Sequence, residues 1–206
     1  MDKIDKPFRL LVATGNQGKI RELRGLLSDL PIELMGLNEI DGIIEIDETG
    51  ATFRENAGLK ATGYARQTGL WALADDSGLE VKSIGGAPGV QSARYAGTNT
   101  GYDVKIGTLL KQIDAVGGSD RRARFVCAMA LADPEGTILY TAEGICEGRI
   151  ARGPRGTFGF GYDPVFIPDG FDLTFGELRD DIKQQISHRA RASAQIMRYL
   201  RDFIDV

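Results

Sequence analysis

Histidine and cysteine are scarce in this chain of 206 residues. The only histidine is His188, which excludes a zinc site built from several histidines and argues against a cysteine–histidine nucleophile pair. The two cysteines, Cys127 and Cys146, each lie in a strand-like stretch. A disulfide between them is open on geometry, but we expect two small buried thiols in a reducing compartment.

Long hydrophobic runs are absent as well. The longest, Phe125–Ala132 and Leu70–Ala74, fall far short of the ~20 residues that a membrane span needs. Met1–Arg9 lacks the apolar stretch of a signal peptide. The net charge of −4 argues against nucleic acid as the main partner, because domains that bind it are usually basic. We therefore expect a cytoplasmic protein that binds neither membrane nor nucleic acid, although a small anion in a local basic pocket is open.

Alternating strand and helix patterns predict an α/β fold with a mixed sheet. Without a repeat or a linker-like break, we expect one domain over residues 1–206, or two closely packed lobes sharing a core. Strands are predicted over 8–13 and 70–74, with a hairpin of 123–132 and 137–147 around Asp133-Pro134-Glu135-Gly136. Helices are predicted after Lys19, with Ile20, Leu23, Leu26 and Leu27 on one face, from Thr52 to about Gln67, over 102–113 and over 187–203.

The first motif that carries chemistry is Thr14-Gly15-Asn16-Gln17-Gly18-Lys19, between the first strand and its helix. A glycine-bearing turn into a helix N-terminus presents backbone N–H groups to an anion, and Lys19 adds a full positive charge. The spacing is not that of a Walker loop. Phosphate binding and a plain strand–helix connection are both open.

The second motif is Asp75-Asp76-Ser77-Gly78, directly after a buried-looking strand. Adjacent carboxylates repel each other unless a cation joins them, which points to Mg²⁺. The acidic stretch 45–48 offers a further ligand. The alternatives are a helix N-cap or Asx-turn for the aspartates and a solvated loop for the acidic stretch.

Two further motifs follow. Gly159-Phe160-Gly161-Tyr162-Asp163-Pro164 carries aromatic rings that can face a planar base, or can pack into the core instead. Lys183 with Ser187-His188-Arg189 places positive charge at a helix start, where it is unfavourable unless it serves a ligand. Contact with a phosphate and a base carbonyl, and a solvated helix start, are both open.

In this order the motifs resemble the Ham1/RdgB family of inosine triphosphate pyrophosphatases, from Leu10 to the last helix. The matching motifs are Ala13-Thr14-Gly15-Asn16 with Lys19, Glu48-Thr49-Gly50 with Glu55-Asn56-Ala57, Ala74-Asp75-Asp76-Ser77-Gly78-Leu79, Gly85-Gly86-Ala87-Pro88-Gly89 with Ser92-Ala93-Arg94-Tyr95, Phe160-Gly161-Tyr162-Asp163-Pro164 and Ser187-His188-Arg189. The resemblance implies hydrolysis of ITP, dITP and XTP to the monophosphate and pyrophosphate, which removes these nucleotides from the pool. It also implies an elongated mixed β-sheet flanked by helices, in two lobes with a central cleft (Maf/Ham1-like), together with a homodimer and Mg²⁺ dependence.

The resemblance further implies roles for single residues. Asp76 would accept the proton and bind the metal, and a second metal ligand falls on Asp47, where family members often have Glu. Phosphates would contact the first motif and Lys60, and His188-Arg189 would contact the base. The implied substrate-binding residues are Thr14, Gly15, Asn16, Gln17, Gly18, Lys19, Lys60, Ser77, Phe160, Gly161, Tyr162, Asp163, Lys183, His188 and Arg189.

Two other interpretations are open at this point. One is a pyrophosphatase of related architecture that acts on other altered nucleotides, such as modified pyrimidines. The other is a non-catalytic module that senses nucleotides. The adjacent Asp75 and Asp76 favour catalysis, because a sensor gains little from two carboxylates side by side.

Overall fold

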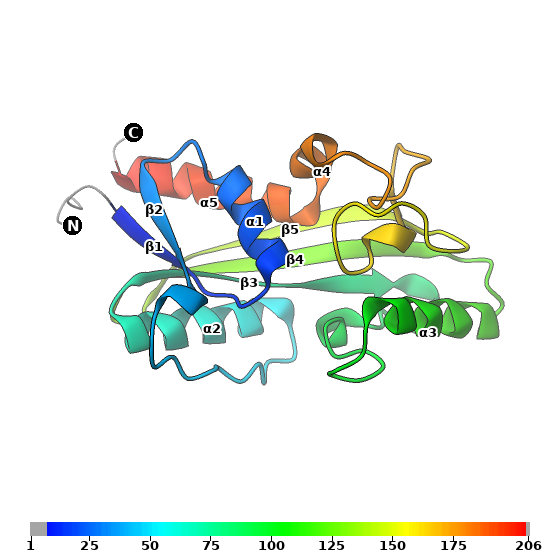
Figure 1. Cartoon of the computed structure of the whole chain (residues 1–206), viewed down its shortest axis with the longest axis horizontal. Helices are drawn as coiled ribbons and strands as arrows, with labels where there is room; N and C mark the ends of the chain where they lie inside the picture. The colour runs from blue at the N-terminus through cyan, green and yellow to red at the C-terminus, as the bar shows by residue number, and fades with distance from the viewer. Residues whose placement is uncertain (1–7, 205–206) are drawn as a thin grey trace. The chain divides into compact units, whose positions relative to one another are not determined.

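A computed structural model describes residues 8–204 of the chain (Figure 1). Six strands form one sheet in the order β2-β1-β3-β4-β5-β6. They are β1 (Phe8–Val12), β2 (Ile32–Gly36), β3 (Trp71–Val81), β4 (Arg122–Ala132), β5 (Ile138–Ile150) and β6 (Phe166–Pro168). Strand β1 runs parallel to β2 and β3, whereas β5 and β6 are antiparallel, so the predicted mixed sheet is confirmed.

Five α-helices accompany the sheet within the described residues. They are α1 (Gln17–Leu26), α2 (Phe53–Thr68), α3 (Tyr102–Ala115), α4 (Asp180–Ile186) and α5 (His188–Ile204). Four short 3-10 turns lie at Leu37–Glu39, Lys82–Ile84, Gly89–Gln91 and Asp163–Val165. None of the helices formed by residues 8–204 has the length and apolar character that crossing a bilayer requires.

The chain divides into two compact units by its internal contacts. Within residues 8–204, the first unit comprises residues 8–76, 127–144 and 189–204, and the second comprises 77–126 and 145–188. Strands β3, β4 and β5 each contribute residues to both units.

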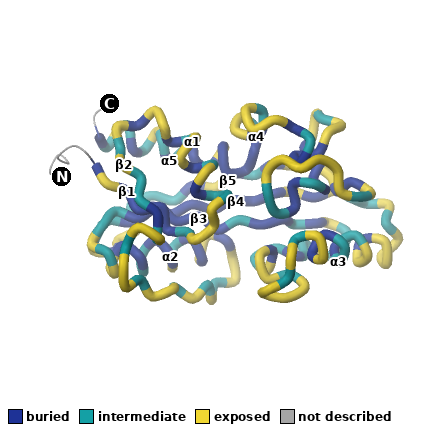
Figure 2. Tube along the Cα trace, viewed as in Figure 1, coloured by how far each residue is buried: buried dark blue, intermediate teal, exposed yellow. Residues whose placement is uncertain are grey.

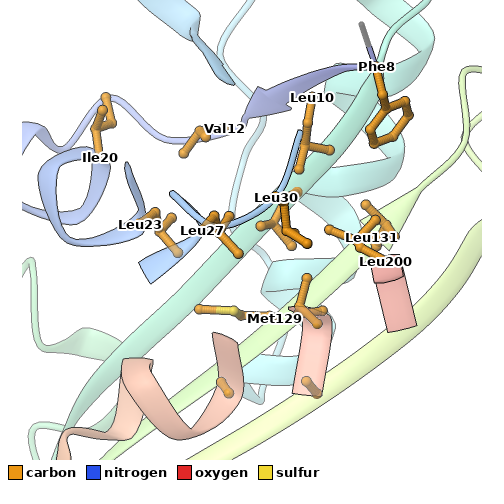
Figure 3. Close-up of a cluster of buried hydrophobic side chains, with 14 of the residues drawn as sticks. Phe8, Leu10, Val12, Ile20, Leu23, Leu27, Leu30, Met129, Leu131 and Leu200 are labelled. Carbon is orange, nitrogen blue, oxygen red and sulfur yellow. The ribbon is translucent and has the colours of Figure 1, made fainter. Parts of the chain in front are cut away.

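The core of the first unit lies between α1, α5 and the strands (Figure 3). Ile20 and Leu23 of α1, three residues apart, are buried against Leu10 of β1 and Leu200 of α5. This confirms the predicted apolar face of the first helix, except that Leu26 is only half-buried. Cys127 is fully buried in the same core.

The core of the second unit is built around aromatic rings. Phe125 of β4 packs on Phe166 of β6 with the ring centroids 4.6 Å apart, and Phe175 joins them. Helix α3 buries its apolar face here and exposes the opposite side (Figure 2). Cys146 is also buried in this unit, and neither cysteine takes part in a disulfide, so the expected thiols are confirmed.

Strand β3 is longer than the sequence predicts. The predicted strand stops at Ala74, whereas β3 continues through both aspartates to Val81. Aspartate is unfavourable in strands, so the sequence predicts that the strand ends before Asp75, and this end is wrong. Charged partners compensate the burial of both carboxylates, with Lys19 and Arg189 beside Asp75 and Lys60 beside Asp76.

The sequence also misses three short elements, β2, β6 and α4. Strand β6 has three residues and α4 has seven, which is too short for a periodic pattern to show. The predicted hairpin is confirmed, since β4 and β5 are neighbours joined by a turn in which the Gly136 N–H donates to the Asp133 carbonyl at 2.9 Å.

Helix α2 begins as its sequence predicts. The Thr52 hydroxyl accepts from the Glu55 N–H at 3.2 Å, and the Glu55 carboxylate accepts from the Thr52 N–H at 3.1 Å. The helix ends at Gly69, which has a φ of 66°.

Replacing the N-cap tests this account of α2. We expect Thr52→Ala to lower the free energy of unfolding by about 1 kcal/mol, because the Glu55 N–H loses its acceptor. Urea denaturation at neutral pH measures the change. An unchanged midpoint would show that the cap does not stabilise the helix.

Candidate active site

The alternation of side chains along β3 separates the two adjacent aspartates. Successive residues of a strand point to opposite faces of the sheet. Asp75 contacts Lys19 of α1 and Arg189 of α5, whereas Asp76 contacts residues of α2. In Figure 1, α1 and α5 lie on one side of the strands and α2 lies on the other. The strand therefore keeps the two carboxylates on opposite faces of the sheet. The mutual repulsion from which the sequence predicts a shared cation is reduced by this separation.

Asp75 is a fully buried carboxylate held by two cations. Its Oδ2 lies 3.1 Å from Lys19 Nζ and 3.0 Å from Arg189 Nη2, and Arg189 also pairs with Glu22 of α1. Burial alone would raise the pKa of Asp75, but the charges of Lys19 and Arg189 outweigh it and hold the pKa well below its usual range. Asp75 therefore stays ionised and fixes the Lys19 ammonium.

The loop that leads into α1 carries the predicted phosphate contacts. Gly15, Asn16 and Gln17 are exposed, and Thr14, Gly18 and Lys19 are half-buried. The Asn16 side chain caps the helix by accepting from the N–H groups of Gly18 at 2.9 Å and Lys19 at 3.2 Å. The capacity of the loop for an anion thus rests on its other N–H groups and on the Lys19 ammonium.

Asp76 has a different environment on the face of α2. Its side chain is 9% exposed, Asn56 Nδ2 donates to its Oδ2 at 3.0 Å, and Lys60 Nζ lies 3.6 Å from its Oδ1. Burial, the largest cause, and the nearby Glu48 raise the pKa of Asp76 above its ordinary value, although Lys60, Lys19 and the hydrogen bond from Asn56 act in the opposite direction. A carboxylate whose pKa is raised toward neutrality is suited to accept a proton.

Lys60 joins Asp76 to a second acid, and that acid is Glu48. Lys60 Nζ lies 2.6 Å from Glu48 Oε1, so one ammonium contacts both carboxylates. Burial lowers the pKa of Lys60, but Asp76, Asp75 and Glu48 together raise it above its ordinary value. Asp47, to which the sequence assigns the second metal ligand, is exposed. The structure thus places Glu48, and not Asp47, beside Lys60 and Asp76.

The residues around Asp76 fit a magnesium ion with few protein ligands. Within residues 8–204 no group of three or more acidic, histidine or cysteine side chains is placed to hold a metal. Glu48 and Asp76 offer two carboxylates on either side of a cationic group, and Mg²⁺ is usually held by one or two carboxylates plus substrate phosphates. Glu48 and Asp76 could therefore be the protein ligands of a Mg²⁺ ion whose other ligands come from elsewhere.

The second unit holds the predicted aromatic motif. The Asp163 carboxylate accepts from the Phe160 N–H at 2.7 Å and pairs with Lys183 Nζ at 2.5 Å. Lys183 Nζ also lies 4.8 Å from the centroid of the half-buried Phe160 ring. Gly159 has a φ of 70°, and a Cβ there would lie 2.0 Å from Asp163 Oδ2. Asp163 is therefore the residue that closes this loop, and it orients Phe160 and Lys183.

Two other predicted substrate residues of this unit are part of its core. Tyr162 is 3% exposed, and its hydroxyl donates to the Ser92 carbonyl at 3.1 Å. The His188 ring stacks on Phe125 at 4.7 Å between centroids, with the planes 10° apart. Ser77 is half-buried and follows Asp76 in β3.

Sequence reasoning missed Glu22 and the pairing of Arg189, and it quoted Asn56 within a motif without assigning it a role. The signal for Asn56 was its position four residues before Lys60, which puts both on one face of α2. Arg189 is 1% exposed and pairs with Asp75 and Glu22. The contact of Arg189 with a base stays a prediction. In the structure Arg189 pairs with Asp75, the carboxylate that also contacts Lys19.

The two aspartates should differ in their effect on stability. We expect Asp75→Asn to lower the free energy of unfolding by about 3–5 kcal/mol, because it removes the charge that compensates the buried Arg189 and the half-buried Lys19. Asp76→Asn should cost much less, since an aspartate whose pKa is raised is less favourable as an anion in the folded chain than in the unfolded one. Urea denaturation at pH 7 measures both, and equal losses would contradict the assignment.

Known proteins match this chain over almost its whole length. The model of the Ham1 family matches residues 10–199. A dITP/XTP pyrophosphatase of Synechococcus sp. (strain CC9311) is 51% identical over 185 residues, which cover 90% of this chain and 86% of that protein. A dITP/XTP pyrophosphatase of Prochlorococcus marinus is 45% identical over 197 residues, or 96% of this chain and 94% of that protein.

A solved structure extends the similarity to the fold. The structure of a HAM1 protein from Coxiella burnetii is 43% identical and superposes with a TM-score of 0.87, covering 95% of this chain and 99% of that one. Sequence motifs, fold and family model agree over almost the whole length. The chain belongs to the Ham1 family.

Proposed function

We propose that the chain hydrolyses the non-canonical purine nucleoside triphosphates ITP, dITP and XTP to the nucleoside monophosphate and pyrophosphate. The observation that carries this proposal is the placement of Asp76, a largely buried carboxylate with a raised pKa that contacts Asn56 and Lys60. It is supported by the relatives named dITP/XTP pyrophosphatase, which match at least 90% of this chain at 45–51% identity.

The first unit would bind the triphosphate and carry out the hydrolysis. Lys19 and Lys60 supply positive charge for the phosphate oxygens, and Asp75 holds Lys19 in place. Asp76 would accept a proton from the water that attacks the α-phosphorus. A bond forms between that water oxygen and the α-phosphorus, the bond from the α-phosphorus to the bridging oxygen breaks, and pyrophosphate leaves. Mg²⁺ held by Glu48 and Asp76 would, when bound, neutralise charge on the phosphates.

The resemblance to the family assigns further substrate contacts to Phe160, Lys183 and His188. Phe160 offers a ring face, with Lys183 beside it. The imidazole of His188 can donate to the O6 of hypoxanthine or xanthine, where adenine presents an amino group instead. The contacts of Ser77, Gly161, Tyr162 and Asp163 with the substrate, like the homodimer and the cytoplasmic location, are part of the proposal and stay predictions.

A panel of nucleotides tests the proposed function. We expect ITP, dITP and XTP with Mg²⁺ to give monophosphate and pyrophosphate at least about 10²-fold faster than ATP, because donors aimed at a 6-oxo group are left unpaired by adenine. EDTA should abolish turnover. In ¹⁸O-labelled water, the label should enter the monophosphate.

Each alternative gives a different result in this panel. Preference for dUTP or another pyrimidine would identify a pyrophosphatase for other altered nucleotides. Nucleotide binding without turnover would identify a sensing module. Release of orthophosphate, or label in the pyrophosphate, would contradict attack on the α-phosphorus.

A further inference from the structure

Asn56 is a fully buried polar residue in the first turns of α2, and both ends of its amide are engaged. Its Nδ2 donates to Asp76 Oδ2 at 3.0 Å. Its Oδ1 accepts from the backbone N–H of Gly50 at 2.8 Å. A neutral amide can donate and accept at the same time, which neither a carboxylate nor an apolar side chain can do.

Helix α2 places Asn56 and Lys60 side by side, facing Asp76. The two residues are four apart, so they lie on the same face of α2. Lys60 Nζ approaches one oxygen of Asp76 at 3.6 Å, while Asn56 donates to the other at 3.0 Å. The two oxygens of this carboxylate therefore have separate partners, which fixes the plane of the group.

The second hydrogen bond of Asn56 reaches the segment that carries Glu48. Gly50 lies two residues after Glu48, whose carboxylate contacts Lys60 at 2.6 Å. The segment passes so close to the amide that a Cβ on Gly50 would lie 2.7 Å from Asn56 Oδ1. One side chain thus connects the Glu48 segment directly to Asp76.

We propose that Asn56 is a positioning residue for the reaction, which fixes the orientation of the Asp76 carboxylate and the place of the Glu48 segment beside it. This inference rests on the proposed function only in that Asp76 must be the group that acts on water. Asn56 acts through Asp76 and Gly50 and has no contact with the nucleotide in this account. Misplacement of a catalytic group by about 1 Å can cost about 10²-fold in rate.

Two substitutions of Asn56 and one matched control test the inference. Asn56→Asp keeps the size of the side chain but replaces the donor facing Asp76 with a carboxylate oxygen, and Asn56→Ser removes the reach of the amide. Thr52→Ala, four residues earlier, weakens the start of the same helix without touching Asp76. For each variant, kcat and KM are measured with the nucleotide that the wild type hydrolyses best, beside the melting temperature.

We expect both Asn56 variants to lose about 10²-fold in kcat while KM stays near the wild-type value. Thr52→Ala should lower the melting temperature and leave kcat unchanged. The inference is overturned if the Asn56 variants keep the kcat of the wild type or change KM alone. It is also overturned if the loss of kcat per degree of lost melting temperature is the same in Thr52→Ala as in the Asn56 variants. It is also overturned if neither Asn56 variant folds, because the residue then serves stability.

The wild-type control separates this inference from the proposed function. If the wild type prefers another nucleotide, the proposed substrate class fails, and the Asn56 variants still decide the inference with that nucleotide. If the wild type hydrolyses none, both are wrong. If the wild type hydrolyses ITP and the Asn56 variants match it, the proposed function stands and the inference alone is overturned.

Discussion

The geometry of a single β-strand determines what the two central carboxylates do. Because successive side chains of β3 point to opposite faces, Asp75 lies among the cations of α1 and α5, while Asp76 faces α2. The first is an anion fixed by two ion pairs, and the second is a carboxylate whose pKa is raised. Two residues that form one acidic motif in the sequence thus lie in two separate environments in the fold.

This separation links the stability of the fold to the position of Lys19 in the first turn of α1. The Asp75 carboxylate compensates the charge of the half-buried Lys19 and, together with Glu22, that of the buried Arg189. The same ion pair sets the position of the Lys19 ammonium at the start of α1, where the helix dipole also favours an anion. On the other face, Asn56 and Lys60 contact Asp76, and Lys60 also contacts Glu48. Each helix thereby supplies the partners of one aspartate.

The sequence predicts the local features and leaves the long-range pairings undetermined. The capping box at Thr52, the hairpin turn at 133–136 and the apolar face of α1 follow from neighbouring residues, and all are confirmed. Arg189, 114 residues from Asp75, could be paired with it only in the folded chain. Lys60 pairs with Glu48, whereas Asp47 is exposed. Which of these two adjacent side chains faces Lys60 depends on the path of the folded chain, and the residue types alone do not predict it. Long-range ion pairs also explain why β3 continues where aspartate predicts an end.

The most direct test of this division between the aspartates is the turnover of Asp76→Asn, measured on protein whose stability and affinity for ITP are determined in parallel. An amide cannot accept the proton from water, so the account predicts a loss of about 10²–10⁴-fold in kcat. Folding should stay near that of the wild type, because Asp75, Lys19 and Arg189 are untouched. Turnover within a few-fold of the wild type would show that Asp76 is not the group that acts on water.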